Sequence, residues 1–120
     1  MRAGQAITAV QAYISGVTRQ DAEALRDLFD ANAHVVGLDE GRFGSVPRDH
    51  WIAFVTSPAR KGAGCETLEV LALNIHGSAA AVVVRTRFGA FDYTDILSLL
   101  LVDGAVRVVG KTYHQHERSV

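Results

Sequence analysis

Three tight-turn signals divide the second half of the chain into four apolar runs. The pairs are Gly77-Ser78, Gly89-Ala90 and Asp103-Gly104, and each lies between segments rich in valine, leucine, isoleucine and alanine. Such two-residue loops join antiparallel strands, because Asp-Gly and similar pairs adopt the positive φ angles that a type I′ turn requires. The sequence therefore predicts a meander of four antiparallel strands over residues 68–116.

The same turns predict which side chains face one another, because a two-residue loop sets the register of its strands. Across Gly89-Ala90, Val84 lies opposite Asp95, and across Asp103-Gly104, Asp95 lies opposite Thr112. Directly opposed residues share one side of a sheet. One predicted face is therefore apolar, and it carries Leu71, Leu73, Ile75, Val82, Val84, Leu97, Leu99, Leu101, Val106 and Val108.

Polar side chains gather at one end of this apolar face. They are Glu69, Thr86, Tyr93, Asp95, Thr112 and His114. Arg107, Lys111 and Tyr113 fall on the opposite, mixed face. A one-residue slip at Gly89 would instead send Tyr93 and Asp95 to that opposite face, and this alternative stays open. The predicted arrangement is an apolar pocket with a polar end.

The first half of the chain has the spacing of helices. An apolar stripe predicts a helix over about residues 4–18, with the members Ile7, Val10, Ile14 and Val17. Asp21 is a good N-cap for a second, short helix, and Pro47 favours the start of a third. We expect a short strand at residues 33–36 and a turn at residues 39–44. Helices on one face of an antiparallel sheet define the α+β class.

Composition indicates a single domain over residues 1–120, since 48% of the residues are hydrophobic and can form a core. The net charge of −1 gives no electrostatic footprint for nucleic acid or for an anionic membrane surface. The longest apolar stretch, residues 96–102, is far too short to span a bilayer, and the N-terminus lacks the pattern of a secretory signal. A lone Cys65 fits a reducing compartment. We therefore expect a cytoplasmic protein that binds neither nucleic acid nor membrane.

No sequence pattern indicates a cofactor. The chain has no phosphate-binding loop and no nucleophile elbow. His114 and His116 have a spacing compatible with metal binding, but no third ligand accompanies them. We therefore expect neither a cofactor nor a metal site.

Two long segments, residues 9–55 and 91–117, carry a family resemblance. Its strongest points are Gln20-Asp21, the segment 30–35, and the series Asp95, Asp103-Gly104, Lys111 and His114. With these features the chain resembles the nuclear transport factor 2-like superfamily, in its SnoaL-like and lumazine-binding-like branch. The resemblance implies a cystatin-like α+β cone, in which a curved sheet wraps around N-terminal helices and a pocket. It also implies a homodimer packed through the outer sheet face.

Three residues are candidates for catalysis. Asp95, partly desolvated, could act as a general base, or it could make a structural hydrogen bond or ion pair. His114 could carry protons near neutral pH, or it could be a surface histidine. The resemblance implies that Tyr13, on the first helix, acts as an oxyanion donor, although a packed ring with a solvated hydroxyl is the commoner outcome. The resemblance also places Asp39 near the catalytic acid of the isomerase relatives, while a solvated turn is the simpler interpretation.

Seven residues are candidates for ligand binding. They are Tyr93, Thr112, Thr86, Glu69, Trp51, Phe54 and His34. Trp51 and Phe54 are expected to face inward from the third helix. The parity of the first strand leaves His34 open, because the family pattern favours Ala33 and Val35 as its inward residues.

Three functions remain possible on this basis. The sequence favours a protein that binds a small hydrophobic or aromatic molecule in an apolar cone. The first alternative is a cofactor-independent isomerase, cyclase or dehydratase that uses acid–base chemistry. The second is a dimerisation or adaptor module with an incidental cavity. The resemblance does not decide among them, because one fold hosts many functions.

Overall fold

The computed structural model describes residues 1–66 and 69–118 and has an α+β architecture. Its helices are α1 (Ala3–Thr18), α2 (Ala22–Leu28), α3 (Arg48–Val55) and the short 3-10 helix η1 (Pro58–Arg60). Its strands are β1 (His34–Asp39), β2 (Arg42–Pro47), β3 (Glu69–His76), β4 (Ala79–Phe88), β5 (Phe91–Val102) and β6 (Ala105–Arg118). The expected α+β class is confirmed.

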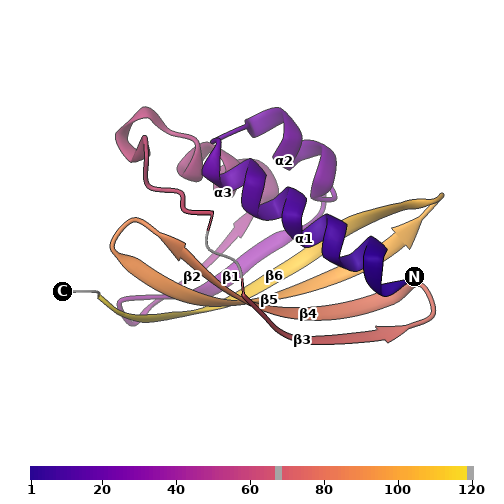
Figure 1. The fold of residues 1–120 in the computed structure, drawn as a ribbon. Coiled ribbons are helices and arrows are strands. Elements are labelled where there is room, and N and C mark those ends of the chain that lie inside the picture. The colour runs from indigo at the N-terminus through magenta and orange to yellow at the C-terminus, as the bar shows by residue number, and fades with distance from the viewer. Residues whose placement is uncertain (67–68, 119–120) are drawn as a thin grey trace.

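The strands form one curved sheet in the order β2-β1-β6-β5-β4-β3. Strands β1 and β6 run parallel, whereas every other neighbouring pair is antiparallel. The helices α1, α2 and α3 cover the same face of the sheet, which curves toward them (Figure 1). None of the helices in the described residues has the length and hydrophobicity needed to span a membrane.

Local signals place the helices where the sequence predicts them. The Asp21 carboxylate accepts a hydrogen bond from the Ala24 backbone N–H and so caps α2. Pro47 lies directly before α3, and its fixed φ suits this position. The core lies between the helices and the sheet, where the largest fully buried side chains are Phe29, Leu25, Ile52, Leu97, Leu99, Val10, Val82, Val84 and Val108.

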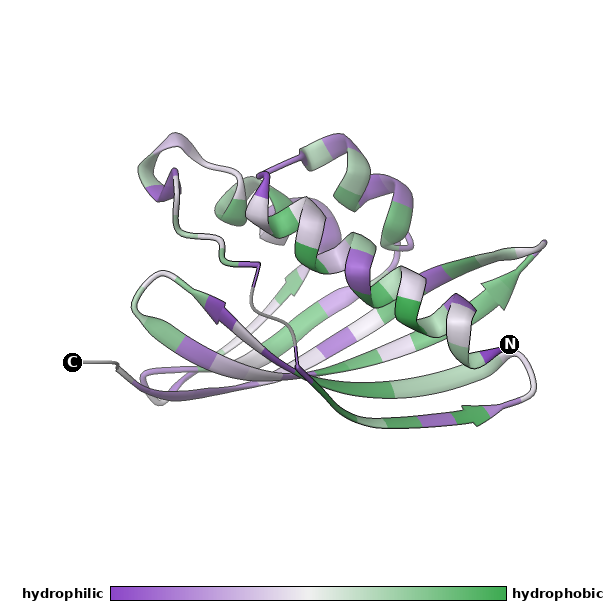
Figure 2. Ribbon diagram, in the orientation of Figure 1, coloured by the Kyte–Doolittle hydropathy of each residue, from purple (hydrophilic) through white to green (hydrophobic). Residues whose placement is uncertain are grey.

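The two ends of the sheet differ in polarity. Figure 2 shows hydrophobic residues concentrated along the strands at the end near the N-terminus. Hydrophilic residues become more frequent toward the other end, where β6 finishes. The layer between helices and sheet is therefore apolar at one end and polar at the other.

The meander of four strands is confirmed over the described residues, although Leu68, where the first strand was expected to begin, lies outside them. Asp103 and Gly104 have φ angles of 49° and 79°, as a type I′ turn requires. The register of β4 with β5 is also confirmed, including Phe88 opposite Phe91 and Val84 opposite Asp95. The slip considered at Gly89 does not occur.

The predicted register of β5 with β6 is wrong beyond its first pairs. Leu99 lies opposite Val108 as expected, but Ser98 pairs with Gly110, so Val109 is an extra residue in β6. Such a β-bulge moves every later residue to the other face. Asp95 consequently lies opposite Tyr113 instead of Thr112. A glycine inside a strand is the local signal for a bulge, and Gly110 supplies it.

A second bulge corrects the prediction for β3. The register shifts between Val70 and Ala72, and Glu69 pairs with Arg85 instead of Thr86. Leu71, expected in the core, is 49% exposed. Leu71 is the extra residue of the bulge, since Val70 lies opposite Val84 and Ala72 lies opposite Val83.

The segment predicted as a turn over residues 39–44 contains a strand. Only Glu40 and Gly41 form the turn, with φ angles of 49° and 82°, and β2 follows as the edge of the sheet. Sequence reasoning missed β2 because an exposed edge strand has no apolar alternation to reveal it. Phe43, its second residue, is 75% exposed. β2 also contains Gly44 and Pro47, and both residue types are uncommon in strands.

Candidate functional site

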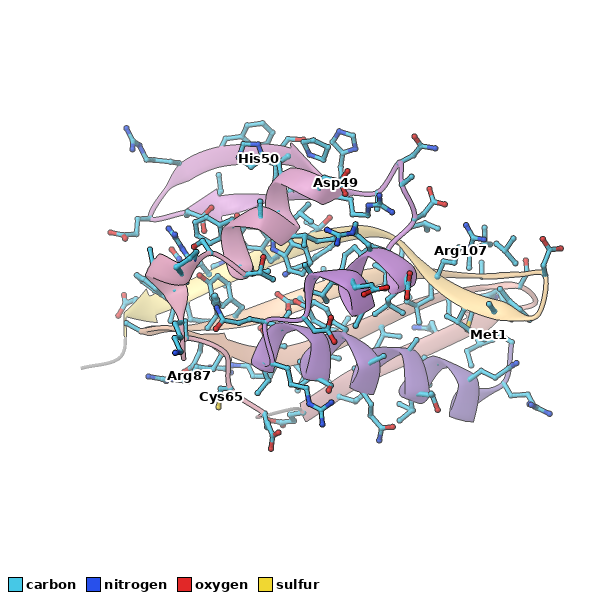
Figure 3. The ribbon with its side chains drawn as sticks, turned by 90° about the horizontal axis from the view of Figure 1, so that it is seen from above. Met1, Asp49, His50, Cys65, Arg87 and Arg107 are labelled. Carbon is cyan, nitrogen blue, oxygen red and sulfur yellow. The ribbon has the colours of Figure 1, made fainter. Side chains whose placement is uncertain are left out.

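A pocket of about 210 Å³ lies between the helices and the concave face of the sheet. Its lining residues are Tyr13, Ile14, Val17, Val35, Asp39, Gly44, Val46, His50, Trp51, Phe54, Val55, Cys65, Thr86, Arg87, Phe88, Tyr93, Asp95, Lys111 and Tyr113. Figure 3 shows that His50, Cys65 and Arg87, three of these, lie toward the end of the molecule away from Met1. The pocket thus lies toward the polar end of the sheet.

Four polar side chains form a buried cluster in this pocket. The Tyr13 hydroxyl donates a hydrogen bond to Oδ2 of Asp95 at 2.7 Å, and the Thr86 hydroxyl donates to the same oxygen at 3.0 Å. Lys111 Nζ donates to the Tyr13 oxygen at 2.6 Å and lies 3.9 Å from Oδ2 of Asp95. Asp95 is only 1% exposed. The cluster is therefore an ion pair bridged by a phenol and shielded from water.

Each member of the cluster comes from a different element. Asp95 and Thr86 lie on the inner face of β5 and β4 because the turn between these strands sets their register. Tyr13 projects from the buried side of α1. Lys111 reaches the same face of β6 only because the bulge at Val109 shifts the strand by one residue.

One hydrogen-bond acceptor of the cluster has no donor. Oδ1 of Asp95 is buried and has no hydrogen-bond partner among the described residues. A carboxylate accepts at both oxygens, and leaving a buried one unpaired costs about 1–3 kcal/mol. The Lys111 ammonium has three N–H groups and uses one of them on a described side chain. The site therefore presents a spare acceptor beside a spare donor.

Burial changes the proton affinities within the cluster. It raises the pKa of Tyr13 well above the ordinary value, and the neighbouring Asp95 carboxylate adds to this effect. Burial also lowers the pKa of Lys111, while Asp95 and Asp39 act in the opposite direction. Tyr13 is thus a neutral phenol, and the charge of Lys111 is less stable here than in water.

Aromatic rings surround the lysine and form one wall of the pocket. Lys111 Nζ lies 4.5 Å from the centre of the Trp51 ring and 5.0 Å from that of Tyr13. The Trp51 and Tyr13 rings stack with their centres 6.1 Å apart. A cation above an aromatic face gains about 0.5–2 kcal/mol, which partly offsets the cost of burying the ammonium.

A second polar group joins β6 to the turn between β1 and β2. The Tyr113 hydroxyl donates to Asp39 Oδ2 at 2.5 Å, and burial together with Asp39 raises the Tyr113 pKa. Gln115 donates to the Tyr93 hydroxyl at 3.1 Å and accepts from the Glu40 backbone N–H at 2.7 Å. Burial also raises the Tyr93 pKa. These contacts hold the β1–β2 turn against the sheet beside the pocket.

Six of the sequence-derived candidates line the pocket. They are Tyr13, Trp51, Phe54, Thr86, Tyr93 and Asp95. Phe54 is half exposed, and the Arg60 guanidinium lies 3.5 Å from the centre of its ring. Trp51 is buried, as expected for a residue of both core and wall.

Four candidates lie elsewhere, and their expected place on the pocket face is corrected. Thr112 and His114 are exposed because the bulge in β6 turns them outward. Glu69 is exposed because the bulge in β3 does the same. His34 is also exposed, and Ala33 and Val35 are the buried residues, as the family pattern favours.

Sequence reasoning missed Lys111 and Tyr113, which it placed on the mixed outer face. Gly110 was the signal that could have found them, because a glycine within a strand suggests a bulge. Asp39 had been considered, and it lines the pocket with its carboxylate on Tyr113.

The two histidines near the end of β6 lie side by side. The rings of His114 and His116 meet edge to face with centres 4.7 Å apart, and His116 Nε2 lies 2.8 Å from the Thr94 hydroxyl. Within residues 1–66 and 69–118, no group of three histidine, cysteine or acidic side chains could hold a metal ion. The arrangement is a paired surface contact.

Comparison with known families gives one match over most of the chain. A family model described as "putative lumazine-binding" matches residues 3–114. A comparison with curated proteins finds no match.

Solved structures with the same architecture are numerous, and several are proteins of unknown function described as nuclear transport factor 2-like. One, from Silicibacter pomeroyi DSS-3, has 26% identity and a TM-score of 0.87, with 94% of each chain covered. Another, from Shewanella baltica OS155, has 24% identity and a TM-score of 0.78, covering 92% of this chain and 90% of the other. A domain from Nostoc punctiforme with a cystatin-like fold has 17% identity and a TM-score of 0.69, covering 98% and 80%. These likenesses confirm the cone fold that the sequence predicts.

Proposed function

This chain belongs to the family described as putative lumazine-binding, within the nuclear transport factor 2-like fold, and from that premise we propose that it binds a small molecule in its pocket. The ligand is planar and largely apolar, with one polar edge. It lies against the aromatic wall and directs that edge toward Asp95 and Lys111.

The unpaired oxygen of Asp95 is the observation that carries this proposal. Asp95 lines the pocket, and its Oδ1 has no hydrogen-bond partner among the described residues, whereas its Oδ2 accepts from the Tyr13 and Thr86 hydroxyls. A ligand N–H or O–H group that reaches Oδ1 recovers the cost of its desolvation. A ligand acceptor placed beside that group can take a free N–H of Lys111.

The pocket also limits the size of the ligand. Its volume of about 210 Å³ is below the ~300–1,000 Å³ typical of sites for drug-sized molecules. One or two fused rings match this volume better than a steroid-sized skeleton does. The apolar residues Val35, Val46 and Val55 and the ring of Trp51 line it with the shape-filling surface that such a ligand needs.

Native mass spectrometry of the protein purified from its own host tests this proposal. We expect one small molecule to be retained and, when added back to stripped protein, to raise the melting temperature. Asp95→Asn should weaken its binding at least tenfold. Asp27→Asn is the matched control, since Asp27 is exposed on α2 away from the pocket lining. Equal affinity of both variants for the retained molecule would contradict the proposed role of Asp95.

Acid–base catalysis is the second candidate, and the direction of the hydrogen bonds favours a specific version of it. The Tyr13 proton points to Asp95, so the donor that faces a developing oxyanion would be Lys111 and not Tyr13. Oδ1 of Asp95 would then be the general base. Exchange of ligand C–H for deuterium in D₂O, abolished by Asp95→Asn, would support catalysis, and unchanged ligand signals would restrict the protein to binding.

We also propose a homodimer through the outer face of the sheet. Ile96 on β5 is 45% exposed and Val109 at the bulge of β6 is 37% exposed, and both lie on the face that the helices leave uncovered. Burying apolar side chains of this kind against a second copy is a common source of dimer stability.

A further inference from the structure

A continuous chain of hydrogen bonds links the amine of Lys111 to the carboxylate of Asp95. Lys111 Nζ donates to the Tyr13 oxygen at 2.6 Å, and the Tyr13 hydroxyl donates to Asp95 Oδ2 at 2.7 Å. The direct distance between the two charged groups is 3.9 Å, longer than a hydrogen bond. A proton that passes between them therefore travels through the phenol.

Shifting both protons by one position converts the ion pair into a neutral pair. The Lys111 proton moves to the Tyr13 oxygen as the Tyr13 proton moves to Asp95, so that Tyr13 remains a neutral phenol. Both hydrogen bonds survive with reversed direction. The transfer removes two charges from a buried site, which offsets part of its cost. Burial also lowers the pKa of Lys111.

We propose that Lys111 is a carbonyl-capturing amine, which forms an imine with a small aldehyde or ketone that enters the pocket. The inference goes beyond the proposed function, on which it rests only for access of a small molecule to the pocket. The neutral Lys111 amine that this transfer produces is buried beside the rings of Tyr13 and Trp51. Few water molecules therefore compete for its lone pair. Tyr13 and Asp95 supply the proton that the reaction consumes.

The step balances without any further reactant. The nitrogen lone pair forms a C–N bond while the carbonyl π pair moves to oxygen, and transfer of one amine proton to that oxygen gives a carbinolamine. Asp95, through Tyr13, protonates the hydroxyl, which leaves as water while the nitrogen pair forms the C=N bond. The water contains the carbonyl oxygen, one amine hydrogen and the Asp95 proton. The protonated imine then faces the restored Asp95 carboxylate.

The chain contains its own control for this chemistry, because Lys61 and Lys111 are its two lysines. Lys61 is exposed, whereas Lys111 is buried in the pocket. The Met1 amine is the remaining primary amine, and it donates to the Gly77 carbonyl at 2.6 Å at the opposite end of the molecule. Labelling of each amine can therefore be followed separately in one sample.

The experiment uses benzaldehyde, a single-ring aldehyde small enough for the pocket, with sodium cyanoborohydride at neutral pH. The reductant traps an imine as a stable benzylamine, which peptide mapping by mass spectrometry assigns to a residue. We expect Lys111 to be labelled at least tenfold faster than Lys61, since each pKa unit of depression gives about tenfold more free amine. Labelling of Lys61 and Met1 with Lys111 equal to or slower than Lys61 would overturn the proposal.

Tyr13→Phe tests the proton path, because it keeps the ring and removes the bridging oxygen. We expect it to slow the labelling of Lys111 about tenfold while Lys61 is unaffected. An unchanged rate at Lys111 in a folded variant would refute the path through Tyr13. If the variant does not fold, the wild-type comparison of Lys111 with Lys61 still decides the proposal.

Benzyl alcohol separates failure of this inference from failure of the proposed pocket. It has nearly the shape of benzaldehyde but no carbonyl group. Stabilisation by benzyl alcohol without labelling of Lys111 would refute the imine and leave the pocket supported. Absence of both effects would overturn both proposals.

Discussion

Tyr13 and Asp95 are hydrogen-bonded at 2.7 Å between the first helix and a central strand, 82 positions apart in the chain. Lys111 joins this pair from the neighbouring strand, so the contact ties α1, β5 and β6 together. A polar contact of this kind within an apolar layer costs free energy unless every member is present. The cluster therefore contributes to the stability of the fold as well as to the chemistry of the pocket.

Tyr13→Phe should destabilise the protein by about 2 kcal/mol, because Asp95 loses a donor and Lys111 loses its acceptor while both stay buried. Urea unfolding followed by circular dichroism measures this loss. Tyr93→Phe is the matched control, since its hydroxyl is only partly buried and bonds to Gln115. Equal losses in the two variants would show that the buried cluster contributes no more to stability than the hydrogen bond between Tyr93 and Gln115 does.

The lowered pKa of Lys111 predicts a pH dependence of stability. Between that folded-state pKa and the ordinary 10.5, the unfolded chain binds the lysine proton and the folded chain does not. The free energy of unfolding should therefore rise with pH in this window. Above about pH 10 the trend should reverse, because the folded state keeps the Tyr13 proton that the unfolded state loses.

Lys111→Met isolates this effect, with Lys61→Met as the exposed control. We expect the rise below pH 10 to disappear in Lys111→Met and to persist in Lys61→Met. Urea titrations at a series of pH values provide the comparison. Parallel pH profiles for wild type and Lys111→Met would contradict the assignment.

Deleting Val109 should remove the bulge from β6 and exchange its two faces beyond that point. Lys111 and Tyr113 would turn outward, and Thr112 and His114 would enter the pocket. We expect a loss of more than about 4 kcal/mol, or no folded protein, by thermal unfolding. Val109→Ala keeps the bulge and should change stability by less than about 1 kcal/mol. A stable deletion variant would show that the bulge is dispensable.

Gly37→Ala should disturb the contact between Tyr113 and Asp39. A Cβ atom at Gly37 would lie 2.6 Å from the Tyr113 ring, so the ring must move away from β1. Overpacking of this kind typically costs about 1–3 kcal/mol. Gly44→Ala on the neighbouring strand is the control, because nothing lies within 4 Å of its added Cβ. The melting temperatures of the two variants should differ clearly, and similar values would refute the close packing.

Ile96→Lys should convert the proposed homodimer into a monomer, because it places a charge at the centre of the outer sheet face. Light scattering coupled to size-exclusion chromatography measures the mass directly. Ala12→Lys adds the same charge on the exposed side of α1 and should leave the dimer intact. A wild-type mass equal to that of one chain would contradict the proposed homodimer.

The features that the sequence predicts are those whose causes are local. Turn pairs such as Asp103-Gly104 and the cap at Asp21 depend on a few neighbouring residues, and they appear where expected. A two-residue loop then carries the register of β4 and β5 as far as Asp95. The α+β class and the apolar layer follow from these elements by periodicity alone.

The composition of the pocket depends on contacts that no local pattern contains. The bulge at Val109 interrupts the ladder of β5 and β6 locally, and it places Lys111 against Tyr13 and Asp95. The edge strand β2 likewise exists because β1 offers it a partner. Sequence by itself therefore determined the helices, the four-strand meander and the register of β4 with β5. The tertiary structure alone decided which side chains face the cavity, because a one-residue shift in a strand reverses its faces and only packing against the helices selects between them.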